Sequence, residues 1–470
     1  KNSLENAESA FPAGMLCPES SAVRFNRPFS ISGIHGQEGL SGDRDNISGE
    51  QVFTLQDGMV RWNGKCYGIM EFRPASAEST FTLHRVKIGI NFHWEREEDQ
   101  TFSGGLTVLP AGEGLVAINS VPVEDYLLSV ISSEMNGDAP EEFLKAHAVI
   151  SRSWLLARPT LGGGDSGGLP NSVADSSEEC SDNRPERIIR WYDREDHTLF
   201  DVCADDHCQR YQGLLRAGNA NIRRAVEATR GLVLTDGPDG SICDTRFSKC
   251  CGGVSERFSA CWADEDFTYL QAIRDTYAEN STSPAGSVPD LSDEQTARDW
   301  ILSSPEAFCN TSDPVLLSTV LNSYDQETAD FYRWKVEYTQ AGLSDLLRRR
   351  SGIDFGDVLE LRPLKRGASG RIIELLIRGT LRTVIVGKEL EIRRWLSESH
   401  LYSSAFVVDT VYEQRPGGVH VPSKFILHGA GWGHGVGLCQ IGAAAMSARG
   451  CTFDRILAHY FRGSCLTRLY

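Results

Sequence analysis

One glycine-rich segment near the C-terminal end of the chain constrains the fold more than any other feature of the sequence. The segment, residues 428–450, is HGAGWGHGVGLCQIGAAAMSARG, with glycine at every second position from Gly429 to Gly437. Glycine adopts backbone angles that other residues avoid, and it lets another group approach the backbone closely. The alanine-rich remainder favours a helix that begins at Gln440 and stops at Gly450. We therefore expect a tight loop that leads directly into a closely packed helix.

The same segment carries polar groups that suit a binding site. His428 and His434 supply hydrogen-bonding groups whose protonation can change near neutral pH, and Gln440 adds an amide at the start of the helix. Together these groups could form one wall of a binding site and present imidazoles to a polar substrate such as a sugar. The alternative is a glycine-rich turn with two packed histidines, which composition alone does not distinguish from a binding site. A phosphate-binding loop is disfavoured, because the Lys-Ser/Thr ending of such loops is absent.

Charge and hydrophobicity weigh against two classes of function. The 470 residues include 47 Lys and Arg against 64 Asp and Glu, a formal net charge of −17. This balance disfavours a nucleic-acid partner, because phosphate-binding surfaces need clustered cations. No run approaches the ~18 consecutive apolar residues of a membrane-spanning helix. The chain is long enough for more than one domain with an ordinary core.

Cysteine content and the first residue point to export. The 13 cysteines are many for a cytosolic protein, and their odd number prevents complete pairing within the chain. The sequence begins with Lys rather than Met, which fits a removed signal peptide, a lost lipoprotein leader or a truncated chain. We expect an exported protein, whether periplasmic, in the cell envelope or extracellular, with some disulfide bridges, some free thiols and a metal site.

Hydrophobic periodicity predicts an α+β fold with several lobes. Residues 1–118 show short alternating runs separated by glycine and polar turns, which predict a β-rich N-terminal region. Residues 119–158 carry apolar residues at helical spacing and predict two amphipathic helices, with Asp138 as the N-cap of the second. A Cys- and His-containing insertion follows at about 160–213, and a polar helical elaboration at about 284–330.

Three ordered motifs resemble the stage II sporulation protein D (SpoIID) family, which includes amidase-enhancer proteins. The glycine-rich segment is similar to the family pattern His-Gly-x-Gly-x-Gly-His-Gly-Val-Gly-Met-Ser-Gln-x-Gly-Ala, except that Leu438 and Cys439 replace the usual Met and Ser. Upstream, PVEDYLLSVISSEM and EEFLKAHAVISRSWLLA look like the family's Glu-x-Tyr-Leu…Ser-Glu-Met and Leu-Lys-Ala-x-Ala-x-x-x-Arg elements. The resemblance spans about residues 116–465 and implies a two-lobed catalytic core, residues 119–465, around a long substrate groove.

The resemblance implies a lytic transglycosylase that cleaves peptidoglycan glycan strands, preferentially strands without stem peptides. Hydrolysis of a glycosidic bond generally uses two carboxyl groups. A transglycosylase can use one, which protonates the leaving oxygen and then takes the proton of the sugar's own 6-hydroxyl as a 1,6-anhydro ring closes. Glu134, just beyond the first predicted helix, matches the family's catalytic acid, and partial burial would help it to hold a proton. Lys145 and Arg152 match the family's functional cations and would hold substrate oxygens or steady Glu134. The alternatives are surface cations and a Glu134–Lys145 ion pair.

A second candidate site lies in the insertion. Its four potential zinc ligands are His197, Cys203, His207 and Cys208. Some members of the family have a zinc site in a similar His…Cys…His-Cys run. The resemblance thus implies a structural zinc ion that shapes the groove, since the reaction itself needs no metal. A Cys203–Cys208 disulfide and plain surface residues are the alternatives.

A third segment, FSKCCGGVSE, resembles the family's Phe-x-Ser…Gly-Gly element, and we expect Phe247 and Ser248 to line the groove. The family usually has Ser just before the glycine pair, where this chain has Cys250 and Cys251. Catalytic thiol chemistry is disfavoured, because no Cys–His–Asn order accompanies the pair. Trp432, which lies inside a motif, is a candidate for stacking on a sugar ring.

A binding role is the alternative function. The amidase-enhancer branch of the family implies a peptidoglycan-binding protein that stimulates an N-acetylmuramoyl-L-alanine amidase and does not cleave glycan itself. The expected partners are therefore peptidoglycan glycan strands and, in this alternative, a cell-wall amidase.

Overall fold

The structure is a computed structural model, and it divides into two compact units that are considered separately. The first unit comprises Lys1–Arg152, Asp193–Leu232 and Arg468–Tyr470, and the second comprises Ser153–Tyr192 and Val233–Thr467. The described residues are 11–17, 20–35, 44–88, 95–157, 185–192, 197–205, 207–214, 218–276, 288–320, 330–414 and 420–470.

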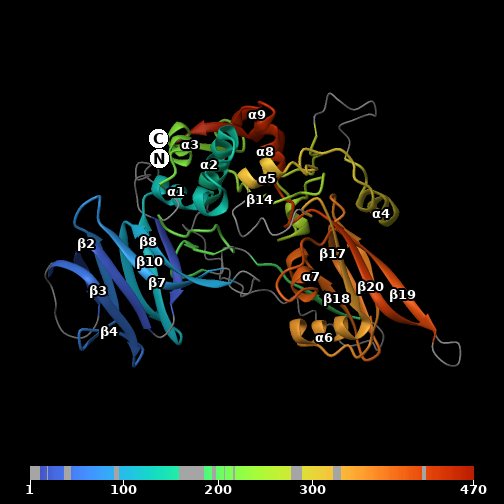
Figure 1. The fold of residues 1–470 in the computed structure, drawn as a ribbon, viewed down its shortest axis with the longest axis horizontal. Helices are drawn as coiled ribbons and strands as arrows, with labels where there is room; N and C mark the ends of the chain where they lie inside the picture. The colour runs from blue at the N-terminus through green and yellow to red at the C-terminus, as the bar shows by residue number, and fades with distance from the viewer. Residues whose placement is uncertain are drawn as a thin grey trace. The chain divides into compact units, whose positions relative to one another are not determined.

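A sheet of 11 strands dominates the first unit (Figure 1). Its strands are β1 (Phe11–Cys17), β2 (Ser20–His35), β3 (Arg44–Gln56), β4 (Met59–Trp62), β5 (Lys65–Tyr67), β6 (Ile69–Pro74), β7 (Thr80–Ile88), β8 (Arg96–Ser103), β9 (Gly105–Ala111), β10 (Gly114–Val121) and β12 (Val202–Cys203). The main path runs β12-β1-β10-β9-β6-β2-β3-β4-β5, and β7 pairs with β2 and β8. The pair β1–β12 is parallel, and β1–β10, β2–β3 and β7–β8 are antiparallel. The β-rich N-terminal region predicted from the sequence is therefore confirmed.

One face of this sheet is a buried aromatic core. Apolar and polar residues alternate along the strands, so that Phe81 and Leu83 of β7 are buried while Thr82 between them is only partly covered. The ring of Phe25 lies 4.9 Å from that of Phe29 and 5.1 Å from that of Phe72, measured between centroids. Since burying one such side chain contributes about 1.5–3 kcal/mol, this face supplies much of the sheet's stability.

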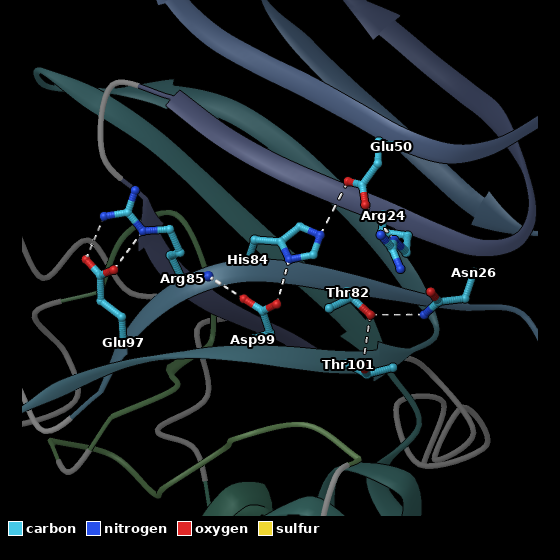
Figure 2. Close-up of polar contacts among 9 residues, drawn as sticks. All are labelled: Arg24, Asn26, Glu50, Thr82, His84, Arg85, Glu97, Asp99 and Thr101. Atoms are coloured by element: carbon cyan, nitrogen blue, oxygen red, sulfur yellow. Dashed lines mark hydrogen bonds and ion pairs between the residues drawn. The ribbon is translucent and has the colours of Figure 1, made fainter.

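The other face carries a polar network (Figure 2). His84 lies between two carboxylates, with Nδ1 2.8 Å from Asp99 Oδ2 and Nε2 3.3 Å from Glu50 Oε2. Arg85 and Glu97 form an exposed ion pair at 2.7 Å between Nε and Oε2. Exposed ion pairs add little stability because water screens them, so the aromatic face holds the sheet together more than this network does.

Three helices complete the first unit: α1 (Val123–Glu134), α2 (Glu141–Leu156) and α3 (Ala220–Ala228). The first unit thus continues beyond residue 118, and its boundary falls within α2. The two helices predicted for residues 119–158 are confirmed, but Glu134 is the last residue of α1 rather than lying beyond it. The predicted N-cap, Asp138, is wrong. Its N–H donates to Asn136 Oδ1 at 3.1 Å within a turn, and α2 begins at Glu141.

The second unit contains four smaller sheets. The elements are β11 (Glu186–Ile189), β13 (Leu232–Thr235), β14 (Phe247–Ser248), a 3-10 turn (Phe258–Ala260), α4 (Glu294–Leu302), α5 (Pro314–Val320), β15 (Arg333–Thr339), α6 (Gln340–Ser351), β16 (Val358–Arg366), β17 (Ile372–Gly379), β18 (Thr383–Gly387), α7 (Glu389–Trp395), β19 (Phe406–Gln414), β20 (His420–Ala430), β21 (Leu438–Cys439), α8 (Gln440–Ala448), α9 (Phe453–Tyr460) and β22 (Cys465–Arg468). The strand orders are β11-β18-β17-β16, β15-β20-β19, β13-β22 and β14-β21. Helices α4 and α5 lie within the elaboration predicted at 284–330.

One hydrophobic core joins the two larger sheets of the second unit. It combines Trp334 of β15, Leu343 of α6, Leu375 of β17, Trp395 of α7 and Phe425 of β20, all at most 5% exposed. Helices α6 and α7 therefore pack into the same core as the sheets, as Figure 1 shows beside β17, β18 and β20. Among the described residues, no helix combines the length and the apolar character needed to cross a bilayer.

Candidate functional site

Glu134 stands at the C-terminal end of α1 and is half-buried. The helix forms because apolar residues recur on one face, and Tyr126, Leu127 and Val130 are completely buried. The side chain of Glu134 is held from outside the helix, since the backbone N–H of Arg210 donates to its Oε1 at 3.1 Å. A carboxyl group is thereby fixed at the edge of a packed helix.

The four predicted metal ligands come together in the first unit. One ligand atom from each of His197, Cys203, His207 and Cys208 lies within 4.8 Å of all the others. His197 Nε2 is 3.3 Å from Cys208 Sγ and 3.2 Å from His207 Nδ1. Two thiols and two imidazoles at these spacings fit the tetrahedral site that zinc prefers. The alternative Cys203–Cys208 disulfide is not formed.

The residues after this Cys/His cluster lie directly on α1. The N–H of Gln212 donates to Ser133 Oγ at 3.2 Å, next to the Arg210–Glu134 bond. The ring of Tyr211 stacks on that of Tyr126, with centroids 4.9 Å apart and an interplanar angle of 18°. The segment that follows the cluster thus contacts α1 beside the Glu134 carboxyl group.

Arg152 is completely buried and forms a two-point ion pair with Glu124 of α1. Its Nε and Nη2 lie 3.0 and 2.7 Å from the two Glu124 oxygens, and Nη1 donates to the Leu232 carbonyl at 3.0 Å. Burial by itself raises the pKa of Glu124, but Arg152, Tyr470 and the Gly231 N–H outweigh it, so that this pKa lies below its ordinary value. The geometry favours a structural role for Arg152 over the predicted contact with substrate.

Lys145 lies one turn into α2 and pairs with two acids of the same helix. Its Nζ is 2.8 Å from Glu141 Oε1 and 2.8 Å from Glu142 Oε1. These hydrogen bonds, first that of Glu141, raise the pKa of Lys145, so the side chain stays charged. The alternative ion pair between Lys145 and Glu134 is thus replaced by pairs within α2.

In the second unit, the backbone geometry explains the alternating glycines. Four of the alternating glycines have φ between 73° and 90°: Gly431, Gly433, Gly435 and Gly437. A Cβ on Gly431 would lie 2.7 Å from the carbonyl oxygen of Cys250, and one on Gly435 would collide with the guanidinium of Arg371. Side chains are therefore excluded both by the left-handed backbone and by close neighbours. The predicted helix follows as α8, with Gly450 at φ 87° after its end.

The third motif lies along this segment. Strand β14 pairs in parallel with β21, and Cys250 and Trp432 exchange backbone hydrogen bonds of 3.1 and 2.8 Å. Phe247 is half-buried, whereas Ser248 is buried and its Oγ has no hydrogen-bond partner among the described residues. The structure thus brings two separated motifs together, although it favours a packing role for Ser248.

The polar residues of the segment fall into two groups. His428 lies on β20 rather than in a loop, with Nε2 3.4 Å from Asp409 Oδ2, and Trp432 is half-buried with Lys249 Nζ 4.9 Å from its ring centroid. Gln440 is buried at the start of α8. Burial, with Arg246 and Arg371 nearby, lowers the pKa of His434 well below its ordinary value, which corrects the expectation that this residue titrates near neutral pH.

Two buried charged residues that organise the segment were missed by the sequence analysis. Arg371 donates from Nη2 to the Gly433 carbonyl at 3.0 Å and from Nη1 to the Cys251 carbonyl at 3.2 Å. Glu256 accepts from the backbone N–H groups of Ala368 and Ser369 at 2.9 and 3.0 Å. Neither residue belongs to a recognisable spacing, so only the tertiary structure identifies them.

The expected disulfide bridges are not found among the 11 cysteines that the structure describes. Cys17 and Cys180 lie outside the residues whose side chains are described.

Comparison with known proteins identifies two matching regions. Residues 111–235 match the model of the SpoIID family, Stage II sporulation protein, and residues 256–437 match a Domain of unknown function (DUF8618). The Amidase enhancer of Bacillus subtilis is 26% identical over 256 residues, which cover 53% of this chain and 33% of that protein. An uncharacterized protein of Brachyspira hyodysenteriae is 34% identical over 55 residues, 12% of this chain and 15% of that protein. The chain therefore spans a third or less of the length of these two relatives.

The first match places the candidate acid in a known family. Residues 111–235 include Glu134, Lys145 and Arg152 together with the four ligands of the Cys/His cluster. The glycine-rich segment lies outside this match, and its first ten residues end the second one. The chain thus contains a SpoIID-family domain and is a distant homologue of the Bacillus amidase enhancer.

Proposed function

We propose that this protein is a lytic transglycosylase that cleaves peptidoglycan glycan strands, with Glu134 as its single acid and base. The observation that carries the proposal is the position of Glu134, half-buried at the end of α1 and held by the Arg210 N–H within a SpoIID-family domain. A carboxyl group there is partly shielded from water and still open enough to meet a substrate. Because peptidoglycan lies outside the cytoplasmic membrane, the proposal includes export.

In the proposed reaction, Glu134 first acts as an acid. It donates its proton to the oxygen that links N-acetylmuramic acid to N-acetylglucosamine, and the bond from this oxygen to the anomeric carbon of the muramic acid breaks. The carboxylate then accepts the proton of the 6-hydroxyl of the same muramic acid. The deprotonated 6-oxygen bonds to the anomeric carbon and closes the 1,6-anhydro ring. Glu134 has thereby recovered its proton, and no water is consumed.

The Cys/His cluster would support this residue by holding a structural zinc ion. His197, Cys203, His207 and Cys208 supply a donor set of the right type and spacing for zinc. A closed site with four protein ligands supplies rigidity rather than a Lewis acid. In this proposal the cluster keeps Arg210 in place, and Arg210 keeps the Glu134 carboxyl group in place.

The remaining predicted residues take two roles in the proposal. Those with partly exposed side chains are proposed to contact saccharide: Lys145, Phe247, His428 and Trp432. Those with buried or closely packed side chains are proposed to support the fold of their own unit: Arg152 in the first unit, and Ser248, His434 and Gln440 in the second. The half-buried Trp432 ring is suited to stacking on a sugar, since it has an apolar neighbour in Phe331, with ring centroids 5.1 Å apart, and a polar one in Lys249.

The relationship to the Bacillus amidase enhancer favours a second candidate function. In that case the protein would bind peptidoglycan strands and stimulate a cell-wall amidase without cleaving glycan. The presence of Glu134 at a supported position favours the enzyme over this alternative.

The test is mass spectrometry of the products formed from purified glycan strands that an amidase has stripped of peptides. A transglycosylase produces 1,6-anhydromuramyl ends, and a hydrolase produces reducing ends. An enhancer leaves the strands intact but accelerates peptide release when an amidase and intact peptidoglycan are present.

Glu134→Gln is expected to lower the rate of anhydro-end formation by about 10²–10⁴-fold, which is the usual contribution of a positioned acid–base group. The matched control is Asp138→Asn, the same carboxyl-to-amide change at an exposed turn residue four positions along the chain. The control should retain the full rate. Equal rates for Glu134→Gln and the unmodified protein would remove Glu134 from the mechanism.

A further inference from the structure

A second cluster of potential metal ligands lies in the interior of the second unit, beside the glycine-rich segment. It consists of Cys251, Asp275, Cys309 and Cys439, and one ligand atom of each lies within 4.8 Å of all the others. All four residues are at most 2% exposed. Three thiols and a carboxyl group are thus collected in one buried place.

Four separate segments bring these residues together. Cys251 follows β14, and Cys439 belongs to β21, which pairs with β14. Cys309 is placed against Asp275 by the backbone, because its own N–H donates to Asp275 Oδ2 at 2.9 Å. The arrangement is therefore supported by strand pairing and by a backbone N–H bond to the carboxyl group of Asp275.

The sulfur spacing distinguishes a metal site from a disulfide. Cys251 Sγ lies 3.6 Å from Cys309 Sγ, whereas a disulfide bond is about 2.0 Å long. Two thiolates on one tetrahedral zinc ion, each at about 2.3 Å, are separated by about 3.8 Å. The observed distance agrees with the second geometry.

The surroundings of the cluster also suit bound thiolates. The N–H of Cys251 donates to Cys439 Sγ at 3.2 Å, and the N–H of Gly253 donates to Cys251 Sγ at 3.4 Å. The Tyr460 hydroxyl donates to Asp275 Oδ1 at 2.6 Å, which orients the carboxylate. Outer hydrogen bonds of this kind orient first-shell ligands in metal sites. As thiolates and a carboxylate these groups need a cation, since buried charges are normally paired or bind metals.

We propose that Cys251, Asp275, Cys309 and Cys439 bind one structural zinc ion. Thiolate ligands select zinc over magnesium or calcium, and four protein ligands in the interior leave no open position for catalysis. An iron–sulfur cluster would need room for its inorganic core between the cysteines, and ligand atoms within 4.8 Å of one another enclose a single ion instead.

This centre would fasten the glycine-rich segment to the rest of the second unit. Cys439 is the residue just before α8, and its partners Cys251 and Cys309 come from positions 188 and 130 residues earlier in the chain. A metal that closes such long loops stabilises the fold, because the free energy of binding becomes free energy of folding. The proposal is independent of the glycan-cleaving function and of the Cys/His cluster in the first unit.

The experiment uses the full chain, purified from zinc-supplemented cells without chelator. The background variant carries Cys203→Ser and Cys208→Ser, so that zinc at the Cys/His cluster is lost. Elemental analysis should find about one equivalent of zinc in this background, and about two in the unmodified protein. Zinc X-ray absorption on the background variant should show three sulfur ligands at about 2.3 Å and one oxygen at about 2.0–2.2 Å.

Adding Cys309→Ser to the background should remove the remaining zinc. The matched control is Cys261→Ser, which alters a buried thiol of the same unit that contacts the His434 carbonyl and lies outside the cluster. This control should keep the zinc. If Cys309→Ser does not fold, the X-ray absorption of the background variant decides the question by itself. A background variant without zinc, or with zinc that has any ligand set other than three sulfurs and one oxygen, would overturn the proposal.

Discussion

Replacing Arg152 by Met is expected to destabilise the helices of the first unit through a single buried charge. Both Glu124 oxygens are bound by Arg152, at 3.0 and 2.7 Å, and the carboxylate also accepts from Gly231 N–H at 3.3 Å and Tyr470 Oη at 2.6 Å. The Arg152 side chain is 0% exposed and that of Glu124 is 13% exposed. Met preserves much of the buried volume but removes the positive charge, so Glu124 loses its counter-ion.

The magnitude follows from the burial of this pair. Removing one partner of a buried ion pair typically costs about 3–5 kcal/mol. Because about 1.4 kcal/mol corresponds to a factor of ten, local opening of α1 and α2 should become about a hundredfold to a few thousandfold more frequent. The double variant Glu124→Gln/Arg152→Met removes both charges and should recover a large part of the loss.

The assay is hydrogen–deuterium exchange of the full chain, followed on peptides from α1 and α2. Exchange of protected amides reports the free energy of local opening. The control is Arg85→Met, which breaks an exposed two-point pair with Glu97 in the same unit and should leave exchange of the same peptides unchanged. The reasoning would be refuted if Arg152→Met left α1 and α2 as protected as before, or if the double variant were no better than the single one.

The same pair predicts a pH dependence of definite sign. Since the pKa of Glu124 in the folded protein lies below the ordinary value of 4.5, its contribution is fully present above that pH and is lost as the pH falls through the folded value. In Arg152→Met, burial without the counter-ion should move the pKa of Glu124 upward. The defect of that variant should therefore be largest at neutral pH and should shrink as acid protonates the carboxylate.

Three further predictions follow from other parts of the structure. On the proposed function, Cys208→Ser should lose zinc from the Cys/His cluster and should slow glycan cleavage although Glu134 is intact. Initial rates and metal content are measured on the same preparation. An unchanged rate after loss of the metal would show that the cluster does not support Glu134. Gly435→Ala should lower the Tm more than Gly450→Ala. Either substitution adds about 1–2 kcal/mol of left-handed backbone strain, but only the new methyl group at Gly435 meets a neighbouring side chain. Equal shifts of the Tm would contradict this prediction. Burial lowers the pKa of His147 in the folded protein to about 3, against about 6.5 in the unfolded chain. The stability that the neutral imidazole contributes is therefore present above pH 6.5 and is lost below it, by about 1.4 kcal/mol per pH unit. As the pH is lowered from 7 to 4, the unfolding midpoint should fall less steeply in His147→Gln than in the unmodified protein.

Local patterns were sufficient for the helices and for the first ligand cluster. Helices α1 and α2 follow from apolar spacing within one or two turns, and the four ligands of the Cys/His cluster lie within a stretch of 12 residues. In both cases the residues that cooperate are close in the chain, so the pattern is visible before the fold is known. The exact ends of the helices were harder to predict from the sequence. Asp138 was expected to cap α2, but its backbone N–H bonds instead to the Asn136 side chain within a turn, and such local contacts compete with capping.

Long-range partnerships could not be predicted in the same way. Arg152 was noticed for its charge, but its partner Glu124 is 28 residues away and is chosen by helix packing. Cys251 and Cys439 were noted as departures from the family pattern, yet their proximity depends on the pairing of β14 and β21 across 188 residues. Asp275 carried no signal in the sequence, since a single acidic residue between loops is most often a surface group.

The alternation of glycine from Gly431 to Gly437 limits which amino-acid substitutions this segment can accept. At each of those positions any side chain meets an unfavourable backbone, so substitutions are tolerated only at the residues between them. Of these, Val436 is buried and His434 is packed against Trp262. Sequence variation within this segment is thereby confined to Trp432, and a saturation scan should show intolerance at every second position with one permissive site among them.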